Sequence, residues 1–217
     1  MPISHDKRVL FIHVPKTGGT TISKILGIPN EKTLNPKDLV SQRRYLVGDL
    51  GLHEKLRHLT YDEILEGHFF PKKTIDSYFK FGFVRNTWDR FISGYCHDMG
   101  VWYPNITDHR FGVEDLERYL HQEVNQFFWR PQVRYIYSGG RCAMDFVGRF
   151  ENMESDWIRL CDMIGLKSQT KSLIRVIRVR HGSKRRHKDY RRYFNDDTRK
   201  FVAKIYQEDI ETFGYKF

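Results

Sequence analysis

The sequence is poor in cysteine and has no long apolar run. Its three cysteines among 217 residues include no CxxC spacing, which argues against a disulfide scaffold and against a structural zinc site. Thiols that stay reduced are typical of the cytoplasm. The apolar run at residues 9–14 is too short for the core of a signal peptide, and no stretch approaches the length of a membrane span. We therefore expect a cytoplasmic protein with no integral membrane segment.

Acidic residues are also in the minority, since Asp and Glu total 27 whereas Lys and Arg total 37, which leaves a net charge of +10. The cations gather in residues 175–192, where Asp189 is the single acid. Such an uneven excess indicates an anionic partner: a nucleic acid, a membrane surface, a polyanionic glycan or a phosphate-rich small molecule. The hydrophobic share of 40% and the charged share of 29% are ordinary for a globular protein.

Strand-like and helix-like segments alternate along the chain. Continuous apolar, β-branched runs predict buried strands, and apolar residues at helical spacing predict amphipathic helices. The predicted strands cover residues 9–14, 80–85 and 145–150, and predicted helices cover residues 20–26, 113–123, 153–164 and 197–212. We find no linker and no internal repeat. The sequence therefore predicts an α/β fold in a single domain, residues 1–217, with a central, mainly parallel sheet flanked by helices.

The segment from His13 to Thr21 lies where the first predicted strand ends and a helix begins. Free backbone N–H groups and the helix dipole favour an anion at such a position. Gly18 and Gly19 allow a sharp turn and a close approach of the backbone, while Lys16 supplies a positive charge. Hydroxyl donors come from Thr17, Thr20 and Thr21. Because Lys16 precedes the glycines, the segment is not a Walker A loop, and we expect it to bind one smaller phosphate group.

A similar arrangement follows the second predicted strand. Arg85 stands at the end of this strand, and in open α/β sheets ligands bind beyond the carboxyl ends of the strands. Asn86 or Thr87 can cap the helix that follows. The apolar face of that helix consists of Trp88, Phe91, Ile92 and Tyr95. Ser93 points away from this face, so Arg85 and Ser93 could hold a second phosphate; the alternative is an Arg85 salt bridge beside a solvent-facing serine.

These two segments resemble the nucleotide-binding motifs of the PAPS-dependent sulfotransferases. Residues 13–21 are similar to the loop that binds the 5′-phosphosulfate, and residues 83–95 are similar to the motif that binds the 3′-phosphate. Their order and spacing resemble those of the carbohydrate-type branch, which includes the heparan 2-O- and chondroitin sulfotransferases. Three further stretches are similar to that branch: residues 66–69, Arg130-Pro131-Gln132, and residues 206–215. The resemblance runs from residue 9 to the C-terminus.

The resemblance implies a fold related to the nucleotide kinases and roles for individual residues. Lys16 would contact the phosphosulfate and neutralise charge on the leaving oxygen. The 5′-phosphate would be held by Thr17, Gly18, Gly19, Thr20 and Thr21. Arg85 and Ser93 would bind the 3′-phosphate, the group that separates PAPS and its product PAP from ordinary adenine nucleotides. A loop near the C-terminus closes over the nucleotide in this branch, and its counterparts here are Ser183, Lys184 and Arg185.

Two features bear on location and acceptor. The N-terminal Golgi anchor of the eukaryotic members has no counterpart in this sequence, which adds to the expectation of a cytoplasmic enzyme. The branch resemblance and the basic and aromatic residues between 95 and 135 favour a hydroxyl-bearing sugar or glycan as the acceptor. Those residues are His97, Trp102, Tyr103, His109, Arg110, Trp129 and Arg130.

Transfer to a hydroxyl also needs a base that takes the proton. We predict His68, which matches the histidine used by the 2-O branch, with Glu66 as the alternative because other sulfotransferases use glutamate. No metal is expected, since no carboxylate cluster and no His or Cys spacing suits one. The remaining N-terminal histidines are interpreted as scattered: His5, His13, His53 and His58.

Two other functions stay open at this point. An ATP-dependent small-molecule kinase would need Mg²⁺ and a carboxylate to hold it, for which Asp49 and Asp145 are candidates. A nucleic-acid-binding protein would use the basic residues 175–192, with Tyr190 and Tyr193 among them. The two paired motifs favour the sulfotransferase over both, so no nucleic-acid partner is expected.

Overall fold

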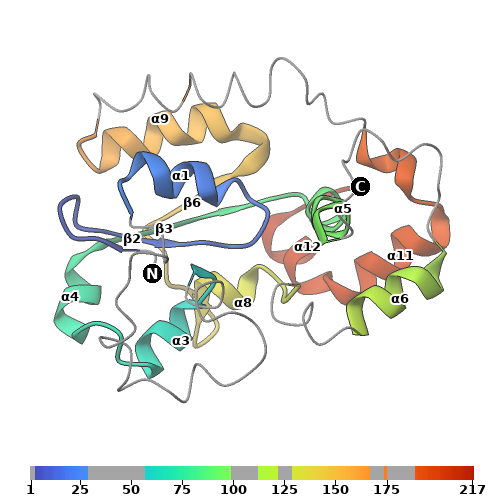
Figure 1. Ribbon diagram of the computed structural model, residues 1–217, viewed down its shortest axis with the longest axis horizontal. Coiled ribbons are helices and arrows are strands. Elements are labelled where there is room, and N and C mark those ends of the chain that lie inside the picture. The colour runs from blue at the N-terminus through green and yellow to red at the C-terminus, as the bar shows by residue number, and fades with distance from the viewer. Residues whose placement is uncertain (1–2, 29–56, 99–111, 122–128, 167–173, 175–188) are drawn as a thin grey trace. The chain divides into compact units, whose positions relative to one another are not determined.

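The computed structural model describes residues 3–28, 57–98, 112–121, 129–166, 174 and 189–217. The chain folds into two compact units, each made of two stretches: residues 1–84 with 134–173, and residues 85–133 with 174–217. The predicted α/β fold, with a mainly parallel sheet flanked by helices, is confirmed (Figure 1). The assignment of residues 1–217 to one domain stays a prediction. In the described ranges, no helix is long and apolar enough to cross a membrane.

The first unit is built on a four-stranded sheet in the order β1-β2-β3-β6. Its strands are β1 (Ile3–Ser4), β2 (Val9–Ile12), β3 (Phe79–Val84) and β6 (Phe146–Arg149). β3 pairs in parallel with β2 on one side and with β6 on the other, whereas β1 runs antiparallel to β2 at the edge. The three predicted strands correspond to β2, β3 and β6. The sequence pattern does not reveal β1, because two residues are too few to show a period.

Helices cover both faces of this sheet (Figure 1). On one face lie α1 (Gly19–Ile25) and α9 (Met153–Met163), and on the other lie α3 (Tyr61–Glu66) and α4 (Lys72–Ser77). The smaller elements are α8 (Val133–Ile136), the hairpin of β4 (Tyr137–Ser138) with β5 (Arg141–Cys142), and the 3-10 helix η4 (Phe150–Asn152). In the core, the rings of Phe11 and Phe81 stack across the β2–β3 pair with their centroids 5.0 Å apart, and Trp157 of α9 is fully buried.

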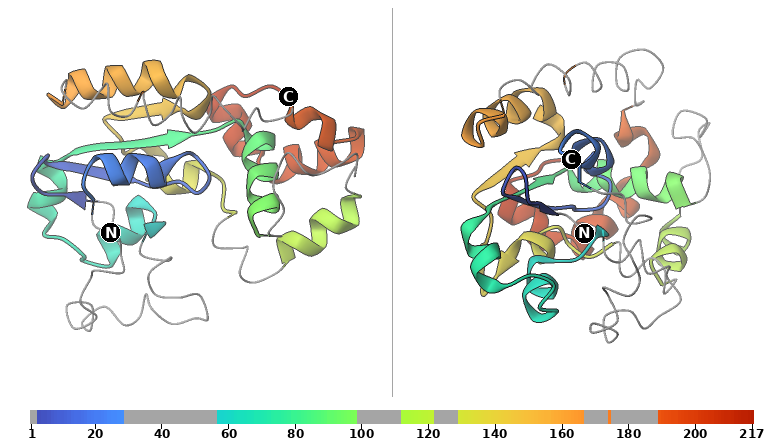
Figure 2. Two further views of the ribbon diagram at one scale, coloured as in Figure 1. Left: turned by 45° about the horizontal axis from the view of Figure 1, so that its top comes forward. Right: turned by 60° about the vertical axis from the view of Figure 1, so that its left-hand side comes forward.

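The second unit is helical in its described part. Its elements are α5 (Thr87–Asp98), α6 (Val113–His121), the 3-10 helix η6 (Tyr190–Tyr193), α11 (Asp196–Ile205) and α12 (Gln207–Phe213). α5 contacts α11 and η6, and α11 contacts α6 and α12 (Figure 2). The predicted apolar face of α5 is confirmed for Trp88, Phe91 and Ile92, all of them buried. The indole Nε1–H of Trp88 also donates to the Arg199 carbonyl at 3.0 Å, which ties α5 to α11.

The prediction of one continuous helix over residues 197–212 is wrong. α11 ends at Ile205 and α12 begins at Gln207, because Tyr206 adopts φ −110° and ψ 29°, outside helical values. Tyr206 is 1% exposed, whereas Ile205, which the helical spacing assigns to the apolar face, is 37% exposed. The new direction of α12 leaves Asp209 fully buried, where its carboxylate accepts backbone hydrogen bonds. The break thus serves a buried polar contact that periodicity alone does not reveal.

Gly148 in β6 should not tolerate a side chain. A Cβ atom there would overlap the ring of Phe83, its fully buried partner on β3. We expect Gly148→Ala to lower the free energy of unfolding by about 1–3 kcal/mol, the usual cost of overpacking a core. Denaturant-induced unfolding measures this, with Gly112→Ala as the control because the nearest atom to a Cβ there, Asp115 Oδ2, lies 3.5 Å away. Equal destabilisation by the two changes would contradict the prediction.

Candidate functional site

The segment between β2 and α1 forms a tight loop. The strand ends at Ile12 and the helix begins at Gly19. Inside the loop, Lys16 has φ 67° and Gly18 has φ 85°, both in the left-handed region. Glycine adopts this region without strain, whereas a lysine rarely does, and strained residues of this kind are typical of functional sites. Lys16, the predicted sulfate-side cation, is half-buried in this loop.

Thr17 stabilises the loop from within. Its hydroxyl donates a hydrogen bond to the Val14 carbonyl at 2.8 Å, and its side chain is fully buried. A hydroxyl has a single proton to donate, so the Thr17 hydroxyl cannot also donate to a phosphate while this bond stands. From the sequence this hydroxyl was expected to contact the ligand; in the structure it bonds within the turn. Thr20 is exposed and Thr21 is half-buried at the start of α1.

Gly19 is a glycine because of its neighbour His13. A Cβ atom at Gly19 would overlap the His13 imidazole. That ring stacks on Phe11 at a centroid distance of 5.4 Å and lies 4.3 Å from the ring of His58. His58 in turn donates from Nδ1 to the His13 carbonyl at 2.8 Å. The interpretation of these two histidines as scattered is therefore wrong: residues 45 apart in the sequence meet beside the loop.

The charges around the loop are positive. Burial lowers the pKa of His13 well below 6.5, and His58, Arg57 and Lys16 lower it further through their positive charge. The ring is thus neutral near pH 7. α1 has no acidic residue in its first turn and no side chain that caps its N-terminus. A neutral imidazole, a lysine and a helix start that has neither a side-chain cap nor an acid in its first turn together form a chemically suitable environment for an anion.

Arg85 is the first residue after β3 and belongs to the second unit. Only 2% of its surface is exposed. Its Nε donates to Asp89 Oδ2 at 2.7 Å, so the salt bridge weighed in the sequence analysis is present. A guanidinium has five N–H donors in a planar fork, of which Nε is the one on Asp89. The assignment of Arg85 to a 3′-phosphate stays a prediction.

The start of α5 continues from Arg85. Asn86, one of the two predicted caps, accepts backbone N–H groups of Trp88 at 3.1 Å and Asp89 at 3.3 Å with its Oδ1. The other, Thr87, is buried, and its hydroxyl has no hydrogen-bond partner among the described residues. Ser93 lies further along α5 and is half-buried, consistent with its predicted place off the apolar face.

Two residues that the sequence analysis gave no role support Arg85. The side chain of Gln132 bonds both backbone groups of Arg85: Oε1 accepts the Arg85 N–H at 2.8 Å, and Nε2 donates to its carbonyl at 2.8 Å. Asp209 accepts the backbone N–H groups of Gln132 at 2.8 Å and of Val133 at 2.9 Å. Burial raises the pKa of Asp209, partly offset by Arg90 and these bonds. The sequence signals for these two residues were the Arg130-Pro131-Gln132 stretch and the stretch 206–215 of the family resemblance.

The two candidate bases lie at the end of α3 in the first unit. Glu66 is the last residue of the helix and is exposed. His68 is also exposed, has φ 50°, and its backbone N–H bonds the Leu65 carbonyl at 3.1 Å. Gly67 between them has no room for a Cβ atom, which would overlap the Phe69 ring. Like Lys16, His68 is a left-handed residue that is not glycine.

Several predicted residues fall outside the described ranges: Ser183, Lys184, Arg185, Asp49, His53 and most of the basic run 175–192. Asp145 is described. Its carboxylate accepts the Lys80 backbone N–H at 2.7 Å and lies 3.2 Å from the Lys80 ammonium. Asp145 precedes β6, so it lies at the amino end of the parallel strands, opposite the edge from which the Lys16 loop departs. Among the described residues, no group of three His, Cys, Asp or Glu side chains could hold a metal ion.

Comparison with known proteins gives one match. The family model described as "Sulfotransferase family" matches residues 1–216. No curated protein and no solved structure matches the chain. The match covers both the Lys16 loop and the Arg85 segment.

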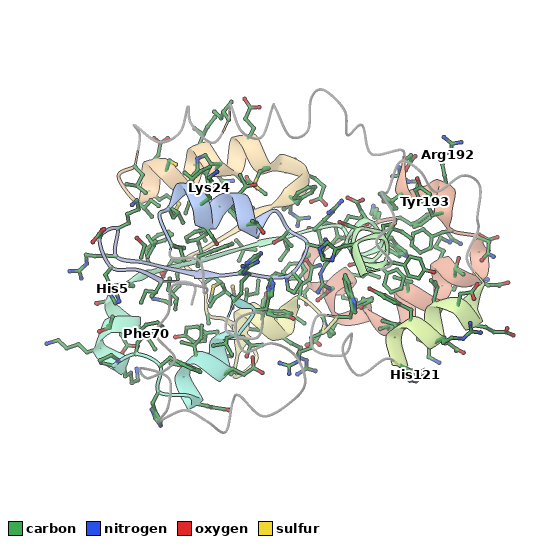
Figure 3. All side chains as sticks on the ribbon, in the orientation of Figure 1. His5, Lys24, Phe70, His121, Arg192 and Tyr193 are labelled. Atoms are coloured by element: carbon green, nitrogen blue, oxygen red, sulfur yellow. The ribbon has the colours of Figure 1, made fainter. Side chains whose placement is uncertain are left out.

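The buried His13 ring makes stability depend on pH. Its pKa is below 6.5 in the folded state, so below that pH the unfolded chain binds a proton that the folded chain does not. The contribution of the neutral His13 ring to the free energy of unfolding is therefore complete above about pH 6.5 and is lost as the pH falls below that value. In urea titrations between about pH 7 and pH 5, the free energy of unfolding should fall more steeply with falling pH in the wild type than in His13→Gln. His121→Gln, at the exposed end of α6 (Figure 3), is the control. An equal dependence of the free energy of unfolding on pH in the wild type and in His13→Gln would refute the prediction.

Proposed function

The chain belongs to the sulfotransferase family and is a sulfuryl-transferring enzyme, and we propose that its donor is PAPS and its acceptor a hydroxyl group of a carbohydrate. The observation that carries the donor assignment is the loop around Lys16. It combines a half-buried cation, a sharp left-handed turn and an uncapped helix start without an acid. PAPS would supply an activated sulfuryl group, and the residues below would bind it and stabilise the charge that leaves with PAP.

On the 5′ side, the proposal assigns the phosphosulfate to the first unit. The ammonium of Lys16 would neutralise the oxygen on which negative charge develops as the sulfur–oxygen bond breaks. Backbone N–H groups from Thr17 to Thr21 would hold the 5′-phosphate. The Thr17 hydroxyl would act indirectly, through the bond to Val14 that keeps the turn closed.

On the 3′ side, the proposal assigns the phosphate to Arg85 and Ser93 of the second unit. Arg85 is buried, and its Nε donates to Asp89; in the proposal its terminal nitrogens would contact the phosphate. Guanidinium and phosphate pair in a bidentate, directional way, which suits the recognition of one phosphate group. Ser183, Lys184 and Arg185 remain predicted contacts of the same nucleotide.

For the acceptor, the proposal assigns proton removal to His68, with Glu66 as the alternative. Both side chains are exposed at the end of α3, where an acceptor hydroxyl has access to them. The acceptor oxygen would bond to sulfur, the bond from sulfur to the phosphate oxygen would break, and the base would take the hydroxyl proton. No metal is needed for this transfer.

A carbohydrate acceptor finds less support from Trp129 than the sequence suggested. This side chain is 5% exposed, packs against Gly94, and has the Arg90 guanidinium 5.3 Å from its ring centroid. It belongs to the core of the second unit and offers no stacking face to a sugar. His97 is exposed and Arg130 half-buried. The sugar assignment therefore rests mainly on the family branch, and the cytoplasmic location stays a prediction.

The kinase alternative loses one of its two candidate metal ligands. Asp145 is engaged with Lys80 at the amino end of the strands, whereas phosphates bind beyond the carboxyl ends in open α/β sheets. The nucleic-acid alternative depended on the basic run, most of which lies outside the described residues.

Thermal unfolding with nucleotides tests the donor assignment. PAP at about a hundred times its Kd should stabilise the wild type by about 2.7 kcal/mol, a Tm increase of roughly 5–10 °C, without Mg²⁺. Lys16→Ala should lose most of this increase because the charge at the 5′-phosphate is gone. Lys24→Ala, which removes an exposed lysine from the last turn of α1 (Figure 3), should keep it. Stabilisation only by ATP with Mg²⁺ would reject PAPS and favour a kinase.

Substitution of His68 tests the base. His68→Asn removes the imidazole but keeps a residue type that tolerates a left-handed backbone, so any loss cannot be blamed on strain at φ 50°. We expect turnover with PAPS to fall by about a hundredfold or more, while the Kd of PAP stays unchanged. Glu66→Gln should have little effect. If only Glu66→Gln lowered turnover, Glu66 and not His68 would be the base.

A further inference from the structure

Arg85 stands where the pairing of the central strand stops. The last paired residues in the ladder are Val84 of β3 and Arg149 of β6. Beyond that point, the peptide groups of Arg85 need other partners, because a buried backbone N–H or carbonyl is costly when left unbonded. The amide of Gln132 bonds both of them, each at 2.8 Å. One planar side chain therefore holds Arg85 as a neighbouring strand would.

Gln132 is itself rigidly held. It is fully buried, and its backbone N–H donates to Asp209 Oδ2. The other oxygen of Asp209 accepts the N–H of Val133, so the carboxylate fixes two successive peptide groups. Asp209 is also fully buried. The backbone position of Arg85 thus depends on a chain of hydrogen bonds through Gln132 to α12.

The side chain of Arg85 is constrained at a second point by the bond from its Nε to Asp89. Asp89 lies in the first turn of α5, which Asn86 caps. With the backbone fixed by Gln132 and Nε fixed by Asp89, the plane of the guanidinium has little freedom. Bidentate pairing with a phosphate depends on that orientation, because the nitrogen donors form a fixed fork.

We propose that Gln132 is a positioning residue for the 3′-phosphate: by clamping the backbone of Arg85 it presents the guanidinium, and so sets the preference for a 3′-phosphorylated nucleotide. This rests on the proposed function, in which Arg85 binds that group. A role confined to stability would weaken every nucleotide alike through loss of folded protein. A positioning role weakens only nucleotides that carry the 3′-phosphate.

The test compares the Kd of PAP with that of adenosine 5′-phosphate, which lacks the 3′-phosphate. Gln132→Met keeps the length of the side chain and removes both hydrogen bonds. We expect the Kd of PAP to rise about tenfold and that of adenosine 5′-phosphate to change by less than about twofold. Val202→Ala is the matched control, since it opens a cavity at a fully buried site of α11 in the same unit. It should leave the ratio of the two constants unchanged.

A double-mutant cycle shows whether Gln132 acts through Arg85. In an Arg85→Gln background, where the guanidinium is absent, Gln132→Met should no longer alter the ratio. An unchanged ratio in the single Gln132→Met variant, or an equal effect with and without Arg85, would overturn the proposal. Gln132→Asn, whose amide is one methylene too short to reach both groups, gives a second measurement if Gln132→Met does not fold. If neither variant folds, Gln132 serves the fold and the proposal is also overturned.

The wild type separates this inference from the proposed function. If the wild type binds PAP no better than adenosine 5′-phosphate, the 3′-phosphate assignment of Arg85 fails before any variant is considered. If the wild type prefers PAP and Gln132→Met keeps that preference, the proposed function stands and only the role of Gln132 is rejected.

Discussion

The parallel pairing of β3 with both β2 and β6 is the constraint on which the first unit depends. It buries the strands between two layers of helices and brings their carboxyl ends to one edge of the sheet. Ile12, the last residue of β2, pairs with Gly82, and β3 continues for two more residues to Val84. The Lys16 loop follows the end of β2 and Arg85 follows the end of β3. Each candidate segment therefore follows the carboxyl end of a parallel strand, which is where open α/β sheets bind ligands.

The loop after β2 shows how packing and electrostatics agree. His13 occupies the space beside Gly19 that a Cβ atom would need, and its burial keeps the ring uncharged. A charged imidazole at that position would repel Lys16 and cost desolvation energy; a carboxylate would neutralise the loop. The neutral His13 ring fills the space beside Gly19 without adding a charge that would compete with Lys16 for an anion. The glycine pair is therefore explained by two separate causes, the left-handed turn at Gly18 and the ring next to Gly19.

The sequence allowed the elements to be predicted better than their contacts. The strands β2, β3 and β6 and the helix α9 follow from apolar runs and helical spacing, which are local signals. The His13–His58 contact, the Gln132 clamp on Arg85 and the Asp209 bonds join residues 45, 47 and 77 positions apart, and no local pattern encodes such pairs. The break between α11 and α12 lies at the backbone angles of one residue, Tyr206, which the helical spacing of apolar residues does not reveal. The hydroxyl of Thr17 bonds the Val14 carbonyl, a contact within the loop that the sequence analysis did not predict.

The ion pair of Arg85 with Asp89 at first sight argues against a phosphate at Arg85, because the carboxylate already neutralises the cation. Burial reverses that reasoning. An arginine whose side chain is 3% exposed is costly to keep without a counter-charge when no ligand is bound. Asp89 supplies that charge at Nε, and a phosphate pairs best with two parallel N–H groups of the fork. The carboxylate can therefore orient the guanidinium and stabilise it before binding, at the cost of some repulsion of the incoming phosphate. If Arg85 binds the 3′-phosphate as proposed, selectivity would come from the direction of the guanidinium more than from net charge, and the bonds of Gln132 to the Arg85 backbone would secure that direction.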